Sequence, residues 1–198
     1  MSHYVKFKYQ RALPDIAPFD ALVELNAFRR KLLEQHLMGV DSNGVGFGNL
    51  SVRDGSTMSF YITGSATGGL PELTPTDCVR VVAYDFATNC LCYEGTAIPS
   101  SESLTHAAIY ESVPTISAVI HCHDSVLWPT RLDRVPTTSK AIAYGTPEMA
   151  YEIMRLFKVT DARSRKIFVM AGHEGGIVSF GKNFAEAFNI LMRARELP

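Results

Sequence analysis

Hydrophobic residues near the start of the chain recur with the period of an α-helix. Residues 19–38 carry an apolar side chain at every third or fourth position, and Gly39 follows where a helix-terminating glycine is expected. The apolar face consists of Phe19, Leu22, Leu25, Phe28 and Leu32. We therefore predict a helix over residues 19–38, preceded by an irregular N-terminal segment.

The pattern then changes to the alternation of apolar and polar residues that is typical of β-strands. Two strand pairs are predicted, residues 50–53 with 58–62 and residues 79–84 with 91–93. The first pair encloses Asp54-Gly55, a dipeptide that favours a tight hairpin turn. Glycine-rich loops flank this hairpin at residues 44–48 and 63–69.

Helices and strands alternate in the second half of the chain. Helices are predicted at residues 101–112, from Thr146-Pro147 through Phe157, and at residues 184–195, with strands at residues 116–121, 167–170 and 177–180. Hairpins followed by such alternation favour an α/β protein with a mainly antiparallel or mixed sheet flanked by helices. The length of 198 residues suits one domain, residues 1–198.

The composition is that of a globular protein, with 46% hydrophobic and 20% charged residues. The formal net charge is −1, and no segment has the density of Lys and Arg that nucleic acid or an anionic membrane would require. We therefore expect a small-molecule partner, with no nucleic acid and no membrane. No apolar run reaches ~18 residues, the N-terminus lacks the apolar core of a signal peptide, and four cysteines do not suggest a disulfide framework. These features favour a cytoplasmic protein with reduced cysteines.

A His121-Cys122-His123 sequence ends the predicted strand at residues 116–121. Residues two apart in a strand project from the same face, so both imidazoles would point one way and Cys122 the other, into the core. An isolated His-x-His is a weak signal, because such histidines are often structural. Two rigidly held imidazoles at a sheet end nevertheless resemble the ligands of an open catalytic metal site.

A third histidine, His173, follows another short apolar segment and is surrounded by Gly172, Gly175 and Gly176. Glycine permits the unusual backbone conformations and close approaches that a ligand-carrying turn needs. The alternative is a tight turn with an incidental histidine. Three histidine ligands would leave a fourth metal position open for substrate or water, which is the arrangement of a catalytic site.

Ser100, Ser101 and Glu102 lie at the start of the helix predicted at residues 101–112. Serine at a helix start is first of all an N-cap, and a carboxylate there complements the helix dipole. The same geometry also gathers free N–H groups and hydroxyls that bind anions, with Glu102 available as an acid/base or a further ligand. His106 lies one turn later, and we expect it to pack in the core or behind the site rather than to bind metal.

The two glycine-rich loops include Gly48-Asn49 and Thr67-Gly68. Neither loop matches a phosphate-binding P-loop motif. Their N–H groups and their Asn, Ser and Thr side chains could hold a phosphate or the hydroxyls of a sugar. Without the histidines, two simple turns beside a hairpin would be the preferred interpretation.

In chain order, these segments resemble the class II aldolase/adducin family. The matching segments are Gly48-Asn49-Leu50-Ser51, Thr67-Gly68, Pro99-Ser100-Ser101-Glu102, His106 with Tyr110, Val119-Ile120-His121-Cys122-His123, and Gly172-His173. Each motif is modest by itself, and their order is specific. The sequence departs from the family where Glu174 follows the third histidine in place of glycine. The stretch between His123 and Tyr144 also offers no counterpart of the tyrosine that donates a proton in the sugar-phosphate aldolases.

The resemblance implies a three-layer α/β/α sandwich around a mainly antiparallel sheet, assembled as a homotetramer. It implies zinc or another divalent metal ion on His121, His123 and His173, with Glu102 as the acid/base. The remaining site residues, implied to bind the phosphate of a substrate, are Gly48, Asn49, Thr67, Gly68, Ser100 and Ser101.

The implied activity is that of a metal-dependent lyase, aldolase-like, which acts on a small hydroxy-carbonyl compound such as a sugar phosphate through an enediolate. The alternatives are an epimerase, dehydratase or decarboxylase at the same site, or a non-catalytic interaction module like the adducin heads. A purely structural metal site is disfavoured, because no fourth ligand of the usual cysteine type is apparent.

Overall fold

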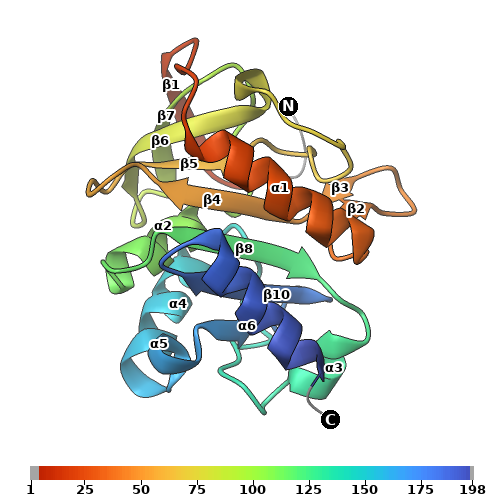
Figure 1. Ribbon diagram of the computed structural model, residues 1–198. Helices are drawn as coiled ribbons and strands as arrows, with labels where there is room; N and C mark the ends of the chain where they lie inside the picture. Colours follow the sequence, from red (N-terminus) through yellow and green to blue (C-terminus); the bar gives the residue numbers. More distant parts are fainter. Residues whose placement is uncertain (1–4, 197–198) are drawn as a thin grey trace.

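The computed structural model describes residues 5–196 and contains an eight-stranded sheet in the order β1-β7-β6-β5-β4-β8-β10-β9 (Figure 1). Its strands are β1 (Lys8–Leu13), β4 (Asn49–Arg53), β5 (Phe60–Thr63), β6 (Cys78–Asp85), β7 (Cys90–Glu94), β8 (Ala118–His123), β9 (Ile167–Val169) and β10 (Gly176–Gly181). All neighbouring pairs are antiparallel except β1 and β7, which run parallel. Two short strands, β2 (Gly39–Val40) and β3 (Gly46–Phe47), form a separate ribbon.

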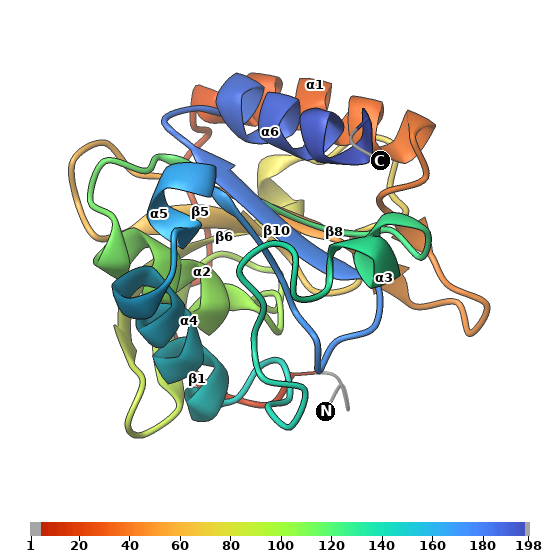
Figure 2. The ribbon, with the colours of Figure 1, turned by 90° about the horizontal axis from the view of Figure 1, so that it is seen from below.

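Helices cover both faces of the large sheet. They are α1 (Ala21–Glu34), α2 (Ser103–Ser112), α3 (Leu127–Arg131), α4 (Pro147–Val159), α5 (Ala162–Arg165) and α6 (Phe184–Glu196). In Figure 2, α1 and α6 lie side by side on one face, and α2 and α4 lie on the other. The predicted three-layer α/β/α sandwich with a mainly antiparallel sheet is therefore confirmed. None of the helices within residues 5–196 is long and apolar enough to cross a membrane.

Each face of the sheet has its own hydrophobic core, because side chains alternate along a strand. In β8, Val119 packs with the residues of α2 and α4, and Ile120 packs with those of α1 and α6. In β10, Val178 likewise packs with the residues of α2 and α4, and Ile177 packs with those of α1 and α6. Strands β8 and β10 are buried on both faces, so neighbouring positions are both apolar at residues 118–120 and 177–178 rather than alternating with polar residues.

The hairpin predicted at Asp54-Gly55 is present as β4 and β5, with Arg53 opposite Phe60. The predicted second strand pair is β6 and β7. The helix predicted at Thr146-Pro147 is α4, and the N–H of Met149 donates to the Thr146 hydroxyl at 3.4 Å, as a helix cap requires.

Two predictions for the N-terminal part were wrong. The first helix ends at Glu34, and the residue in the left-handed conformation that follows it is His36, with φ of 56°, not Gly39. The N–H of Leu37 donates to the Leu32 carbonyl at 2.9 Å, and the N–H of His36 donates to the Leu33 carbonyl at 3.0 Å. These two bonds form a Schellman motif, which terminates the helix even though its key residue is not glycine.

The segment expected to be irregular contains the edge strand β1. All six of its side chains are exposed, so no apolar alternation marks it in the sequence. Its pairing with β7 rests on backbone hydrogen bonds, with Lys8 opposite Cys90 and Tyr9 opposite Leu91. Pairing of this kind depends on the neighbouring strand and leaves little trace in the pattern of side chains.

Candidate metal centre

Two histidines lie at the C-terminal end of β8, in the middle of the sheet. The register places His121 opposite Asn49 of β4, and His123 opposite Gly176 of β10. Both imidazoles project from the face that carries α2, because residues two apart share a face. Cys122 projects from the opposite face and is fully buried in the core beneath α1 and α6, as the sequence predicted.

His173 reaches the same place from the turn between β9 and β10. The N–H of Gly176 donates to the His173 carbonyl at 2.8 Å, which closes the turn. A Cβ at Gly176 would lie 2.7 Å from the His173 ring, and a Cβ at Gly175 would lie 3.3 Å from the Cβ of His123. Gly175 also has φ of +78°. Glycine is therefore required here for the rings to approach one another.

The three imidazoles converge on one point. Nε2 of His123 lies 3.1 Å from Nε2 of His121 and 3.0 Å from Nε2 of His173, and the three ligand atoms all lie within 4.8 Å of one another. A ring nitrogen carries one N–H or one lone pair, so the same atom of His123 cannot donate to one neighbour and accept from the other. Tetrahedral zinc ligands at ~2.0–2.1 Å from the ion are separated by about 3.3 Å. The observed separations therefore fit three lone pairs that share one cation.

Glu102 lies beside the three rings at the start of α2. It occupies the N-cap position, but its side chain makes no capping hydrogen bond and turns toward the histidines instead. Its Oε2 lies 2.9 Å from Nε2 of His121 and accepts a hydrogen bond of 3.0 Å from Nδ2 of Asn49. Its Oε1 is buried without a hydrogen-bond partner and lies 3.9 Å from Nε2 of His173. An unsatisfied buried carboxylate oxygen at this point fits a site that holds a cation.

The electrostatics favour neutral imidazoles at His123 and His173 next to an ionised carboxylate at Glu102. Burial lowers the pKa of His123 to about 3 and the pKa of His173 to about 4, and neighbouring imidazoles contribute to both shifts. Burial by itself would raise the pKa of Glu102, but the charge of His121 and the hydrogen bonds to His121 and Asn49 hold it below its usual range. Neutral imidazoles with free lone pairs beside an anion form a donor set suited to a divalent metal ion.

A cavity of about 170 Å³ opens onto the histidines. Four of the residues that the sequence assigned to substrate binding line this cavity, namely Gly48, Asn49, Ser100 and Ser101. Glu102 and the three histidines line it as well. No lysine or arginine is among the residues that line it. An anionic group of a substrate would therefore be held by hydroxyls and backbone N–H groups rather than by a cationic side chain.

Thr67 and Gly68 lie behind the cavity rather than in its lining. The Thr67 hydroxyl donates to the Gly64 carbonyl at 2.8 Å, and a Cβ at Gly68 would collide with the backbone of Phe47. Ser65 and Ala66 of the same loop line the cavity in their place. The loop that the sequence assigned to the site therefore lines the cavity through other residues, because the direction of each side chain depends on the turn that the loop makes.

A buried arginine anchors this loop from below. Arg29 of α1 has no exposed surface, and its guanidinium donates to the carbonyls of Thr67 at 2.7 Å and Leu70 at 3.0 Å. Burial lowers the pKa of Arg29, and the nearby Cys78 and Asp77 oppose that shift. Because Arg29 belongs to a helix far away in the sequence, nothing in the loop itself indicates this support.

Two aromatic residues beside the histidines were not assigned from the sequence. The Phe47 ring lies 5.2 Å from the His123 ring, and the Tyr144 ring lies 4.3 Å from the His173 ring. Both residues line the cavity. The ammonium group of Lys6 lies 3.7 Å from the centre of the Tyr144 ring and donates to the Tyr144 carbonyl at 3.1 Å. A single aromatic residue in a two-residue strand or in a loop carries no periodic signal, so only the folded structure places Phe47 and Tyr144 beside the histidines.

His106 lies behind the cluster of three histidines, in agreement with its expected packing role. It is fully buried, and its Nδ1 lies 2.7 Å from the Ser51 hydroxyl, which also lies 2.7 Å from the Tyr110 hydroxyl. Burial lowers the pKa of His106 to about 3. A neutral ring that is held in this way supports the floor of the site without contributing to the cluster of ligands.

Comparisons with known proteins agree with this fold. Residues 34–197 match the family described as Class II Aldolase and Adducin N-terminal domain. L-fuculose 1-phosphate aldolase is 27% identical over 91% of this chain and 84% of its own, with a TM-score of 0.69. YgbL from Escherichia coli, a candidate aldolase/epimerase/decarboxylase, is 19% identical over 88% and 84%, with a TM-score of 0.63. An aldolase II superfamily protein from Pseudomonas syringae is 17% identical over 91% and 74%, also with a TM-score of 0.63. A search of curated proteins found no match.

Proposed function

This chain belongs to the class II aldolase and adducin family, and from that premise we propose that it is a metal-dependent lyase that cleaves a small hydroxy-carbonyl substrate, a sugar phosphate by preference. The observation that carries the proposal is the convergence of three imidazole nitrogens beside the buried carboxylate of Glu102. We further propose zinc or another divalent ion as its cofactor, carbohydrate metabolism as its role, a homotetramer as its assembly and the cytoplasm as its compartment. Residues 1–198 would form one domain.

In this proposal, His121, His123 and His173 hold the metal ion through Nε2, and Glu102 moves the proton. A divalent ion held there would supply a Lewis acid that offsets negative charge as it develops on the substrate oxygens. Glu102 is ionised and buried within reach of that point, so it can accept the proton of a substrate hydroxyl and return it to carbon. Asn49 donates to Glu102 and fixes the direction of the carboxylate.

The lining of the cavity supports a small polyhydroxylated substrate. Ser65, Ser100 and Ser101 supply hydroxyls, and the glycine-rich segment at Gly46 and Gly48 brings the backbone close to the ligand space. Hydroxyls and backbone N–H groups can hold either sugar hydroxyls or a phosphate, whose charge they partly offset. The absence of a cationic side chain from this lining makes hydroxy acids without phosphate a reasonable second substrate class.

The proposal is tested first by metal content and then by turnover. The protein, purified without chelator, should contain about one divalent ion per chain, and His123→Ala should lose it. The zinc-loaded protein is then supplied with L-fuculose 1-phosphate, other ketose and aldose phosphates, and hydroxy acids, and aldehyde or ketone release is measured. A chain that binds no divalent ion with measurable affinity would contradict the enzymatic proposal and favour a non-catalytic module.

The same experiment separates the alternative reactions. An epimerase returns an isomer of the substrate, a dehydratase releases water, and a decarboxylase releases carbon dioxide, whereas a lyase of the aldolase type yields two carbon fragments. YgbL, described with three of these reactions, shares the fold with this chain. The products therefore decide the reaction class, while metal dependence is common to all of these alternatives.

A further inference from the structure

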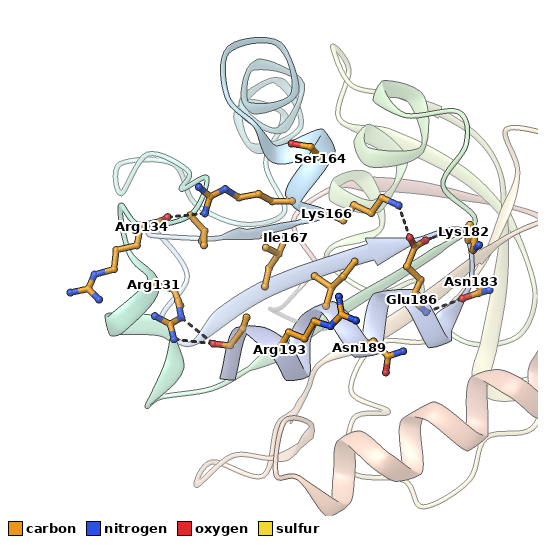
Figure 3. Close-up of a pocket in the computed structure, with 14 residues that line it drawn as sticks. Arg131, Arg134, Ser164, Lys166, Ile167, Lys182, Asn183, Glu186, Asn189 and Arg193 are labelled. Atoms are coloured by element: carbon orange, nitrogen blue, oxygen red, sulfur yellow. Dashed lines mark hydrogen bonds and ion pairs between the residues drawn. The ribbon is translucent and has the colours of Figure 1, made fainter. Parts of the chain in front are cut away.

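A second and larger cavity lies away from the metal centre, between α6 and the edge strand β9. Its volume is about 960 Å³, within the range of pockets that bind small molecules. Figure 3 shows that one wall is α6 and the other is the segment from α5 into β9, with the loop after α3 at one end. It shares no lining residue with the cavity at the histidines. The proposed lyase activity does not use it.

The cavity is strongly basic in a chain whose charges are otherwise balanced. Six of its lining residues are cationic and one is acidic, whereas the whole chain has 19 basic and 20 acidic residues. The cationic residues are Arg131, Arg134, Arg165, Lys166, Lys182 and Arg193. A concave surface lined by one sign of charge concentrates ligands of the opposite sign.

The single carboxylate in the cavity is already paired. Glu186 accepts from the Lys166 ammonium at 2.6 Å and from the backbone N–H of Lys182 at 2.7 Å, and the hydrogen bond from Lys166 lowers the pKa of Glu186. Within residues 5–196, no carboxylate lies within ion-pair distance of the side chains of Lys182, Arg134 or Arg193. Arg165 is paired with Asp161 at 2.6 Å, and Arg131 donates to the Ala194 carbonyl at 3.1 Å. The positive charge that remains for a ligand is therefore that of Arg134, Lys182 and Arg193.

The cations are distributed along the length of the cavity. In Figure 3, Arg131 and Arg134 lie at one end, Lys166 and Lys182 lie at the other, and Arg193 of α6 lies between them. The middle is apolar, with Ile167 of β9 facing α6. From this arrangement, we propose that the cavity binds an elongated small molecule that carries an anionic group, such as a phosphate, at each end.

Other occupants fit the observations less well. No aromatic side chain is among the lining residues, so the cavity offers no stacking surface for the bases of a single-stranded nucleic acid. A second copy of the chain docked through the same face would oppose two sets of like charges, which is unfavourable. A small dianion needs neither feature.

The proposal is tested with inorganic phosphate and a series of linear alkane bisphosphonates from propane to octane. Binding is followed by backbone amide chemical shifts at constant ionic strength. We expect saturable shifts in α6, from Phe184 to Glu196, and an optimal chain length that binds about tenfold or more tightly than phosphate, because both ends are engaged at once. Shifts confined to β8 would instead mean binding at the histidines, and affinities equal to that of phosphate would mean a one-ended ligand. Either result would overturn the proposal.

Charge variants provide the matched comparison. The double variant Lys182→Gln and Arg193→Gln should weaken binding of the best bisphosphonate about fivefold or more. Arg30→Gln removes the same kind of charge from the exposed surface of α1 and should change it by less than about twofold, as expected for a screened, distant charge. Equal affinities for the double variant and the Arg30 variant would refute the assignment.

Discussion

Replacement of Glu102 by glutamine tests whether the carboxylate does chemistry. Glutamine keeps the shape of the side chain and an oxygen that can accept from Asn49, but it removes the negative charge and the ability to accept a proton. In the structure, the carboxylate is 3% exposed and lies 2.9 Å from Nε2 of His121, so water cannot substitute for it. We expect turnover to fall by ~10²–10⁴-fold, which is the usual contribution of a positioned acid/base. This loss corresponds to about 3–5 kcal/mol in the activation free energy.

Metal binding must be measured separately from turnover. Loss of a group that supports metal ligands lowers metal affinity by about 10–100-fold, so Glu102→Gln should bind zinc more weakly and still bind it. Turnover is therefore compared at saturating zinc, with zinc affinity obtained from competition with a chelator of known affinity. The control is Glu148→Gln, an exposed carboxylate in the first turn of α4. It should retain full turnover and lose only about 0.3–1 kcal/mol of stability.

Two results would refute this reasoning. Full activity of Glu102→Gln at saturating zinc would exclude Glu102 as the proton-transfer group. A loss of turnover that is entirely restored by more zinc would show that Glu102 serves the metal site only. In both cases, the metal content of His123→Ala would test the assignment of the three histidines independently of Glu102.

Three further predictions concern stability. A divalent ion bound to the folded chain at a free concentration of about 100 times Kd stabilises the fold by about 2.7 kcal/mol. Removal of the ion by a chelator should therefore lower Tm in a thermal scan by roughly 5–11 °C at this chain length. An unchanged Tm would argue against a bound ion. Burial lowers the pKa of His106 to about 3 in the folded chain, whereas the unfolded side chain titrates near ~6.5. The unfolded state therefore binds more protons than the folded state between these two pH values, so the free energy of unfolding falls as pH decreases from ~6.5 toward 3. In urea titrations, His106→Gln should reduce the change of unfolding free energy with pH by up to about 1.4 kcal/mol per pH unit. Arg29→Met leaves the carbonyls of Thr67 and Leu70 without a donor and should cost about 2–4 kcal/mol in urea unfolding, while Arg30→Met on the exposed side of the same helix should change stability by no more than ~0.5 kcal/mol.

Most of the secondary structure could be predicted from local patterns. The Asp54-Gly55 hairpin and the Thr146-Pro147 helix start are present because turns and caps are decided by a few neighbouring residues. The two predictions that were wrong, for β1 and for the end of α1, concern features that depend on backbone hydrogen bonds. Strand β1 exists because β7 offers it a backbone edge, and α1 ends at His36 through a backbone motif that does not need glycine. Neither cause is visible in the side-chain pattern.

In the candidate site, too, local patterns predicted some features and tertiary contacts decided the others. The shared face of His121 and His123 follows from the strand period alone, and the sequence by itself also placed Cys122 in the core. That His173 meets them depends on the pairing of β10 with β8, a contact between segments about 50 residues apart, and on glycines that let the rings approach.

Only the tertiary structure decided which loop atoms face the cavity. It turned Thr67 away from the cavity, brought Ser65 and Tyr144 to its lining, and placed Arg29 beneath the loop. It also gathered cations from α3, α5, α6 and the segments that follow α3, α5 and β10 into one basic cavity, although the sequence has no long basic stretch. Local sequence fixes backbone conformation and the face on which a side chain lies. Convergence of distant groups depends on how the sheet and helices pack, because packing sets which faces meet.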